Sequence, residues 1–241
     1  KRVFEICDEI ERRNIIIELN ASYGLRADRT DRDLLNKMRK TGFKRIAFGV
    51  EAGNNKILSN IKKGETIEEI EMAIKNACEL NYEVILFFLI GSPGETEKDI
   101  EDSFRLVNKY PIADALFYNL TPFPNTELYD WIEKNGYFVL PPSEYLNGNM
   151  HWSNTPVFFT PELSVKQRKL IYKRGLKISN KLRKGYKFLC YRDGFRKVAI
   201  LGNLLAYFLS RDIIQYLLSS SKTLRKLRSE AKKRGWYQRT I

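Results

Sequence analysis

The run Val84-Ile85-Leu86-Phe87-Phe88-Leu89-Ile90 ends in Gly91-Ser92-Pro93-Gly94-Glu95-Thr96. A continuous apolar run of this length is typical of a strand covered on both faces, and the glycine-proline turn ends it before a helix begins. About forty residues earlier, Arg45-Ile46-Ala47-Phe48 runs in the same way into Gly49-Val50-Glu51-Ala52-Gly53-Asn54. In a parallel α/β sheet or barrel such turns lie at the carboxyl ends of the strands, where ligands bind. The two loops therefore predict a ligand site at one edge of a sheet.

Strand-like and helix-like segments alternate along the first part of the chain. The strands are expected over 15–19 (continuing irregularly to 28), 44–50, 83–90 and 114–120. The helices are expected over 2–13, 31–41 with Thr30 as its cap, 54–61, 66–80 with a Thr66–Glu69 capping box, 97–109 and 125–135. This alternation predicts an α/β fold with a parallel sheet and helical crossovers. Four strands are few for a closed barrel, so the chain is expected to form an incomplete (β/α) TIM-like barrel whose first strands lie before Lys1.

The composition changes along the chain and predicts three parts. Residues 1–136 would form the partial barrel. Residues 137–162, rich in Pro, Asn, Gly and aromatic residues, would form an irregular connection. Residues 163–241 would form a basic α-helical C-terminal extension, with helices at about 163–183, 193–209, 211–219 and 222–234.

The net charge of +13 is concentrated in the C-terminal part. Residues 163–241 hold 22 Lys and Arg against 3 Asp and Glu, whereas residues 1–162 hold 20 against 26. Such asymmetry suggests an acidic partner for the extension. We expect a helical cap packed on the barrel, with peripheral membrane contact through 186–237 as a further prediction. Nucleic acid is disfavoured as a partner, because the basic residues spread over several helices and no RNA-binding motif is seen.

The cysteines give no metal-binding pattern. Cys7, Cys78 and Cys190 are far apart and form neither CxxC nor CxxxCxxC, so no metal ligand is predicted in this chain. Buried, reduced thiols in a cytoplasmic protein are the expected state. No apolar run is long enough to span a membrane, since the longest, at 198–209, falls short of the roughly 20 residues needed.

Five stretches taken together, in this order and spacing, resemble the radical S-adenosylmethionine (radical SAM) enzymes. They are residues 24–28, 48–54, 61–64, 88–96 and 122–129. The resemblance covers roughly residues 1–135 and is nearest to the branch whose members often carry an N-terminal cobalamin-binding domain. It implies an enzyme that uses a 4Fe–4S cluster to cleave S-adenosylmethionine to a 5′-deoxyadenosyl radical. It also implies cobalamin as a further cofactor if such a domain precedes the chain.

The resemblance also implies roles for residues of the two loops. The carboxylate of Glu51 can accept hydrogen bonds from both ribose hydroxyls, although it could instead cap the helix that follows. Lys63 is expected to face the carboxylate of S-adenosylmethionine, with Lys62 as the alternative. Ile90 and Gly91 are expected to lie against adenine, the apolar side chain on the ring and the backbone on its edge.

Further site residues are expected at the ends of the first and fourth strands. Arg26 is expected to face the cofactor or substrate while Asp28 is structural; the alternative is that the two side chains pair with each other. Pro122, Pro124 and Asn125 are expected to line the substrate side. Asn tolerates the left-handed backbone conformation of the glycine that many relatives have at this position.

The chain departs from the family at the cluster motif. The family holds its cluster through three cysteines in a CxxxCxxC loop, which none of the three cysteines matches, so the ligands are expected to lie before Lys1. This chain alone is therefore expected to be inactive. Cobalamin-dependent methylation or rearrangement of a small-molecule or lipid-like substrate is the leading expectation. A radical SAM methylthiotransferase or RNA-modifying enzyme is an alternative, and a non-catalytic module with a basic docking tail is another.

Overall fold

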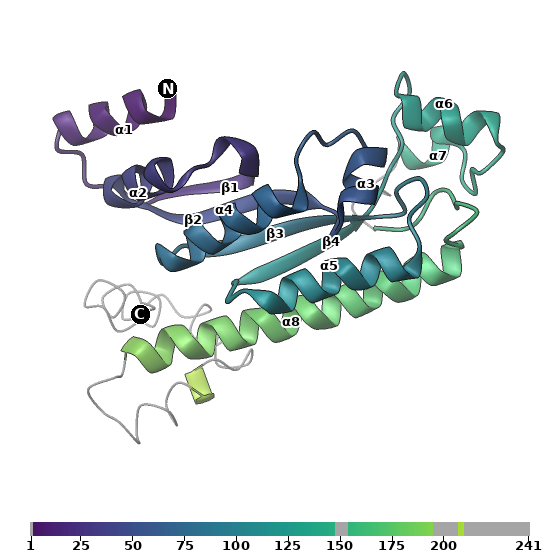
Figure 1. The fold of residues 1–241 in the computed structure, drawn as a ribbon. Helices are drawn as coiled ribbons and strands as arrows, with labels where there is room; N and C mark the ends of the chain where they lie inside the picture. Colours follow the sequence, from purple (N-terminus) through teal and green to yellow (C-terminus); the bar gives the residue numbers. More distant parts are fainter. Residues whose placement is uncertain (1, 148–153, 195–206, 210–241) are drawn as a thin grey trace.

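Four parallel strands form the centre of the molecule. The computed structural model describes residues 2–147, 154–194 and 207–209. The strands are β1 (Leu19–Leu25), β2 (Phe43–Glu51), β3 (Glu83–Ile90) and β4 (Asp114–Asn119), and they lie side by side in the order β1-β2-β3-β4 (Figure 1). All three pairings are parallel. The carboxyl ends of the strands therefore meet at one edge of the sheet, near α3 (Asn55–Asn60) and α6 (Glu127–Lys134), and the predicted α/β class is confirmed.

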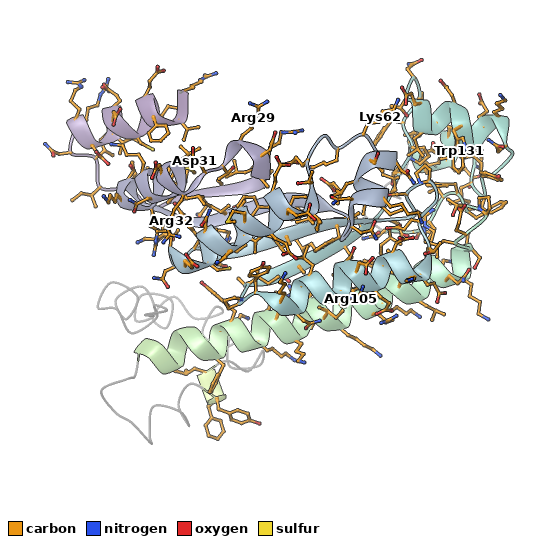
Figure 2. The ribbon with its side chains drawn as sticks, viewed as in Figure 1. Arg29, Asp31, Arg32, Lys62, Arg105 and Trp131 are labelled. Atoms are coloured by element: carbon orange, nitrogen blue, oxygen red, sulfur yellow. The ribbon has the colours of Figure 1, made fainter. Side chains whose placement is uncertain are left out.

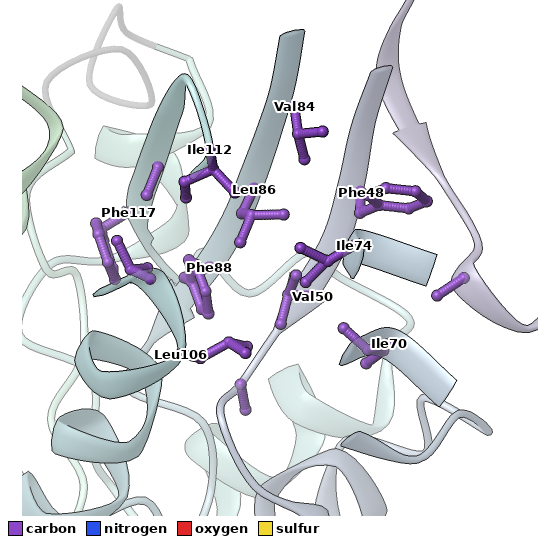
Figure 3. Packing of buried hydrophobic residues seen from close by; sticks show 14 of the residues in the cluster. Phe48, Val50, Ile70, Ile74, Val84, Leu86, Phe88, Leu106, Ile112 and Phe117 are labelled. Atoms are coloured by element: carbon purple, nitrogen blue, oxygen red, sulfur yellow. The ribbon is translucent and has the colours of Figure 1, made fainter. Parts of the chain in front are cut away.

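Helices connect the strands and pack on one face of the sheet. They are α2 (Arg32–Thr41), α3, α4 (Ile67–Glu79) and α5 (Glu97–Lys109), and α1 (Arg2–Arg12) packs on α2. Along β3, alternate residues are buried under the helices. Figure 3 shows this core, which includes Phe48, Val50, Ile70, Ile74, Val84, Leu86, Phe88, Leu106, Ile112 and Phe117.

The other face of the sheet is less covered by the described residues. Ile85, Phe87 and Leu89 of β3 are only half-buried, and Tyr118 of β4 is 45% exposed. The continuous apolar run of β3 had indicated cover on both faces, but its buried and half-buried residues alternate. We call this less covered surface the open face, and at the carboxyl edge it is available to a ligand.

After β4 the chain forms a small second core before returning to the sheet. α6 and α7 (Pro142–Tyr145) enclose Ile132, Tyr145, Val157 and Phe158, and Phe138 pairs with Phe158 in an isolated antiparallel bridge. The long helix α8 (Val165–Gly194) then packs along β4, beside α5 (Figure 1). None of the helices in the described ranges is long and apolar enough to cross a membrane.

Some sequence-based boundaries were wrong. The strand predicted over 15–19 is β1, at Leu19–Leu25, and Ile16 is fully exposed. The reason is register: β2 begins only at Phe43, which pairs with Leu19, so the isoleucines before Leu19 have no neighbouring strand. At the other end, α8 continues through the predicted stop at 183 to Gly194.

The helix caps were predicted with mixed success. The Thr66–Glu69 capping box is confirmed at the start of α4. Thr30 does not cap α2, because Asp31 accepts the hydrogen bond from the Leu34 amide while the Thr30 hydroxyl donates to the Arg26 carbonyl. The helices predicted over 211–219 and 222–234, most of the one over 193–209 and much of the predicted membrane contact over 186–237 lie outside the described residues. The division into three parts stays a prediction.

Candidate functional site

Glu51 ends β2 in an unusual backbone conformation. Its φ of 66° lies in the left-handed region, which non-glycine residues rarely adopt. The Lys63 ammonium donates a hydrogen bond to Glu51 Oε1 at 3.2 Å, and the side chains of Lys63 and Glu51 are only 16% and 21% exposed. Strained backbone of this kind persists where surrounding contacts hold it, and it is frequent at ligand sites.

Gly49 makes room for this ion pair on the open face. A Cβ atom at Gly49 would lie 2.7 Å from Glu51 Oε1 and 3.3 Å from Lys63 Nζ. The neighbouring Phe48 and Val50 side chains are buried under the helices, so the side of β2 at Gly49 that carries Glu51 and Lys63 is the open one. Glycine is thus needed here for the close approach of two charged side chains.

A second carboxylate, Glu65, faces the same lysine. Glu65 Oε2 lies 3.4 Å from Lys63 Nζ, and the side chain is fully buried. Its other oxygen accepts hydrogen bonds from the amides of Ala27 and Asp28, at 2.6 and 3.1 Å, and so links the loop before α4 to the end of β1. Glu65 could not be found from the sequence, because a glutamate in the polar stretch Lys62-Lys63-Gly64-Glu65-Thr66 gives no sign of burial.

Arg26 takes the second of its two predicted arrangements. Its guanidinium donates to both oxygens of Asp28, at 2.9 and 3.1 Å, and to the carbonyls of Lys63 and Gly64, both at 3.2 Å. The hydrogen bonds from Arg26 lower the pKa of the Asp28 carboxyl. Arg26 therefore holds the Lys63 loop in place, and its direct contact with a ligand stays a prediction.

Lys62, the alternative to Lys63, points elsewhere. Its ammonium pairs with Glu127 at the start of α6, and both side chains are exposed. Figure 2 shows Lys62 at the end of the molecule where α3 and α6 lie. Of the two lysines, Lys63 is therefore the one at Glu51.

The immediate surroundings of Lys63 carry a net negative formal charge. Glu51 and Glu65 supply two carboxylates to its one ammonium, while the nearby Asp28 pairs with both Arg26 and Arg29. An ammonium has three N–H donors, and Lys63 uses one of them in its hydrogen bond to Glu51, so another can donate to a ligand. The arrangement suits a ligand with hydroxyl donors or positive charge.

A separate group of contacts surrounds the second glycine loop. Gly91 has a φ of 93°, and Glu95 Oε2 accepts hydrogen bonds from the amides of Gly91 and Ser92 at 2.6 and 3.2 Å. The Glu95 side chain is fully buried, and burial raises its pKa to about 7. Glu95 therefore closes the loop from inside the protein.

Arg168 of α8 is buried against this loop. It donates to the carbonyls of Ile90 (3.0 Å), Leu120 (3.3 Å) and Phe158 (2.7 Å) and to Asn119 Oδ1 (3.1 Å). A Cβ atom at Gly91 would lie 2.3 Å from the Arg168 Cζ atom. Burial lowers the pKa of the guanidinium to about 10. Arg168 could not be found from the sequence, because nothing in a basic helix distinguishes one arginine from the neighbouring cations.

The Ile90 side chain lies in the core under the helices and is fully buried, and its predicted contact with adenine stays a prediction. Leu89 and Phe87 alternate with it and point to the open face, where Phe87 meets Tyr118 edge-to-face at 6.4 Å. The period of two along β3 was the available signal. Backbone contact of Ile90 and Gly91 with a ligand stays a prediction.

The residues after β4 differ in exposure. Pro122 is buried and its carbonyl accepts a hydrogen bond from the Tyr145 hydroxyl at 2.8 Å. Pro124 and Asn125 are exposed, and Asn125 has a φ of 64°, the left-handed conformation that its sequence position suggested. Their predicted place on the substrate side is not tested by these contacts.

The residues present do not fit an iron–sulfur cluster. Cys7 lies in α1 and Cys78 in α4, both buried, and the described part of the chain has no group of His, Cys, Asp and Glu side chains that could hold a metal.

Removing the buried Glu95 carboxylate should change how stability depends on pH. Its folded-state pKa of about 7 lies above the ordinary 4.5, so the fold favours the protonated form and loses stability as the pH rises from 4.5 to 7. In Glu95→Gln the side chain at position 95 no longer titrates, and its amide oxygen can still accept hydrogen bonds from the Gly91 and Ser92 amides. The unfolding free energy of Glu95→Gln relative to the wild type is therefore expected to rise by up to about 3 kcal/mol across this range, and to be constant outside it.

Urea unfolding at pH 4.5, 6 and 8 measures this difference. The Glu97→Gln variant, which removes an exposed carboxylate two residues later at the start of α5, controls for the change in net charge. A difference that stays constant with pH would show that Glu95 has no raised pKa.

Comparisons with known proteins find similarity to radical SAM proteins in the N-terminal part of the chain. Residues 1–107 match the model of the radical SAM superfamily. An uncharacterised methyltransferase of Pyrococcus horikoshii is 29% identical over 135 residues, which cover 56% of this chain and 29% of the relative. A tRNA-2-methylthio-N(6)-dimethylallyladenosine synthase of Wolbachia pipientis is 38% identical over 83 residues, 34% of this chain and 19% of the relative. The matches thus span less than a third of these relatives.

A solved structure supports the fold. Coproporphyrinogen III oxidase from Escherichia coli, described as a radical SAM enzyme, superimposes with a TM-score of 0.51 at 14% identity. The match covers 75% of this chain and 37% of that protein.

Proposed function

Since residues 1–107 belong to the radical SAM superfamily, we propose that the carboxyl edge of the sheet binds S-adenosylmethionine, with Glu51 and Lys63 as its central contacts. The single observation that supports this most is the Glu51–Lys63 pair at the end of β2. Both side chains are largely shielded, both lie over the open face, and Gly49 leaves them the space.

The charge of the site complements that of the ligand. S-adenosylmethionine carries a sulfonium and an ammonium against one carboxylate, so it has a net positive charge. The Glu51–Lys63–Glu65 group has a net negative formal charge. Charge-assisted hydrogen bonds are about twice as strong as neutral ones, so such complementarity favours binding over neutral nucleosides.

The residues of the site have different roles in binding the ligand. Glu51 accepts hydrogen bonds from the ribose hydroxyls, and a further N–H of Lys63 donates to the ligand carboxylate. Glu65 and Arg26 keep the Lys63 loop in position. Phe87 and Leu89 offer apolar surface to the adenine ring, beside the backbone of Ile90 and Gly91.

The chemistry proposed for the whole protein is radical chemistry. S-adenosylmethionine, cleaved reductively at a 4Fe–4S cluster, supplies a 5′-deoxyadenosyl radical that abstracts hydrogen from a substrate. The cysteines of this chain do not fit the cluster, so the proposal places its ligands outside these 241 residues and expects the chain alone to be inactive. In the complete protein, cobalamin serves as a further cofactor. The reaction is the methylation or rearrangement of a small-molecule or lipid-like substrate, which lies beside residues 122–125. The protein is cytoplasmic.

The second candidate is a methylthiotransferase that modifies RNA. The similarity to the Wolbachia pipientis tRNA synthase favours it. The complete gene product discriminates the two candidates, because cobalamin bound to the purified protein supports the first and a second cysteine-bearing domain supports the other.

Replacing Glu51 tests the binding proposal. Glu51→Gln is expected to weaken S-adenosylmethionine binding about tenfold, because a neutral amide replaces a charged acceptor of two hydroxyls. Equilibrium dialysis with labelled S-adenosylmethionine measures this in the complete, anaerobically reconstituted protein. Glu127→Gln is the matched control, since it removes an exposed carboxylate at the same edge. Equal affinities in all three proteins would remove Glu51 from the site.

Turnover tests the reaction class. The reconstituted protein, reduced in the presence of S-adenosylmethionine, is expected to release 5′-deoxyadenosine. An intact cluster without this product would contradict the proposed chemistry.

A further inference from the structure

The outer side of α8 carries a continuous basic surface. Residues 165–188 contain ten Lys and Arg and no Asp or Glu, and all of the ten except the buried Arg168 are exposed or half-buried. The opposite side of α8 is packed on the sheet: Ile171 is buried, Ser179 donates to Asp114 at 2.6 Å, and a Cβ atom at Gly175 would lie 2.7 Å from the Phe117 ring. The apolar side of the helix is therefore already occupied by the protein itself.

The basic residues of α8 divide by position around the helix. Arg174 and Arg183 flank the buried side and pair with carboxylates, Glu101 at 2.6 Å and Asp114 at 3.7 Å. The exposed lysines that recur every fourth residue form what we call the lysine stripe: Lys169, Lys173, Lys177 and Lys181. At about 100° per residue, the stripe lies opposite Ile171, Gly175 and Ser179.

The lysine stripe forms an extended row of positive charges along α8. With a rise of about 1.5 Å per residue, its lysines repeat every ~6 Å over ~18 Å. Leu170, 53% exposed, and Leu176, 42% exposed, lie beside it. In Figure 1, α8 runs along the outside of the molecule, with β4 and α5 on one side of it.

We infer that the lysine stripe docks this protein on an anionic lipid surface. Charge complementarity gives the occupant: lysines near an anionic bilayer each increase binding about fivefold. Lysine is a compact point charge, whereas arginine is the residue typical of nucleic-acid recognition, and the two arginines beside the stripe are bonded to the protein's own carboxylates. Because the apolar side of α8 is covered, the contact is superficial and should weaken strongly with salt.

Vesicle sedimentation of the 241-residue chain tests this inference. The chain is mixed with phosphatidylcholine vesicles that contain or lack phosphatidylglycerol, at low and high sodium chloride. The stripe variant carries Lys169→Gln, Lys173→Gln, Lys177→Gln and Lys181→Gln, and Gln retains helix propensity. The control variant loses the same charge at exposed lysines of other elements: Lys40→Gln, Lys75→Gln, Lys98→Gln and Lys134→Gln. The basic residues of 195–241 are unchanged in both variants.

The expected result is binding to the anionic vesicles only, lost at high salt. The stripe variant should bind at least tenfold more weakly than the wild type and the control less than twofold. Equal losses in both variants, or none, would overturn the inference. A mixed-sequence RNA serves as a third arm, and binding to RNA without vesicle binding, abolished in the stripe variant, would assign the stripe to nucleic acid instead. None of these outcomes bears on the S-adenosylmethionine site.

Discussion

Replacement of Arg168 by Met is expected to lower the unfolding free energy by about 4 kcal/mol. Methionine fills much of the same volume but donates no hydrogen bond, so the carbonyls of Ile90, Leu120 and Phe158 and the Asn119 side chain lose a buried donor. Leaving buried polar groups unsatisfied costs about 1–3 kcal/mol each, and partial relaxation reduces the sum. Urea unfolding followed by circular dichroism measures the loss.

Two further variants make this prediction specific. Arg105→Met removes an arginine that points outward from α5 and pairs with Asp102 at the surface (Figure 2), so its effect should stay below about 1 kcal/mol. Arg168→Lys keeps the charge but has fewer donors, and it should fall between Met and the wild type. If Arg168→Met unfolds at the same urea concentration as the wild type, the four acceptors must find other donors.

Replacement of Gly53 by Ala is expected to cost about 3 kcal/mol. The added Cβ atom would lie 2.2 Å from the Ser103 amide nitrogen and 2.4 Å from the Asp102 carbonyl carbon. Both are backbone atoms of α5, so no side-chain rotation relieves the clash, and the loop after β2 must move away from the helix. Because Glu51 begins this loop, the proposed binding of S-adenosylmethionine should weaken as well.

Gly185→Ala is the matched control for the added methyl group. A Cβ atom there meets nothing within 4 Å, and Gly185 lies inside α8. Alanine should therefore stabilise the chain by about 0.5–1 kcal/mol through its helix propensity. Thermal unfolding of both variants measures the contrast in sign. A Gly53→Ala variant as stable as the wild type would mean that the loop and α5 are not packed as closely as described.

Much of the fold could be predicted from the sequence because its signals are local. The Thr66–Glu69 capping box and the strand–glycine–helix turns at 49–54 and 91–96 depend on residues three or four positions apart. The alternation of such units then leaves a parallel sheet as the simplest arrangement. The start of β1 failed because it is set by a neighbouring strand rather than by its own composition.

The candidate site was only half predictable for the same reason. Glu51 and Lys63 belong to recognisable motifs, whereas Glu65 and Arg168 are defined by partners far away in sequence. Arg168 and Ile90 are 78 residues apart in the sequence, and no local sequence pattern near either residue predicts their contact. The side of β3 on which Ile90 lies was available from its period of two, but a continuous apolar run conceals that period.

The Arg168 contacts also determine which part of the structure can form first while the chain is being synthesised. Asn119, the last residue of β4, precedes its partner Arg168 by 49 residues, and Ile90 precedes it by 78. On a ribosome that adds about 5–20 residues per second, roughly 2–10 s separate the synthesis of β4 from that of Arg168. All four strands are thus made before the guanidinium that holds the ends of β3 and β4 exists. During translation, the scaffold of this protein can assemble first, and the carboxyl edge of its sheet is completed last.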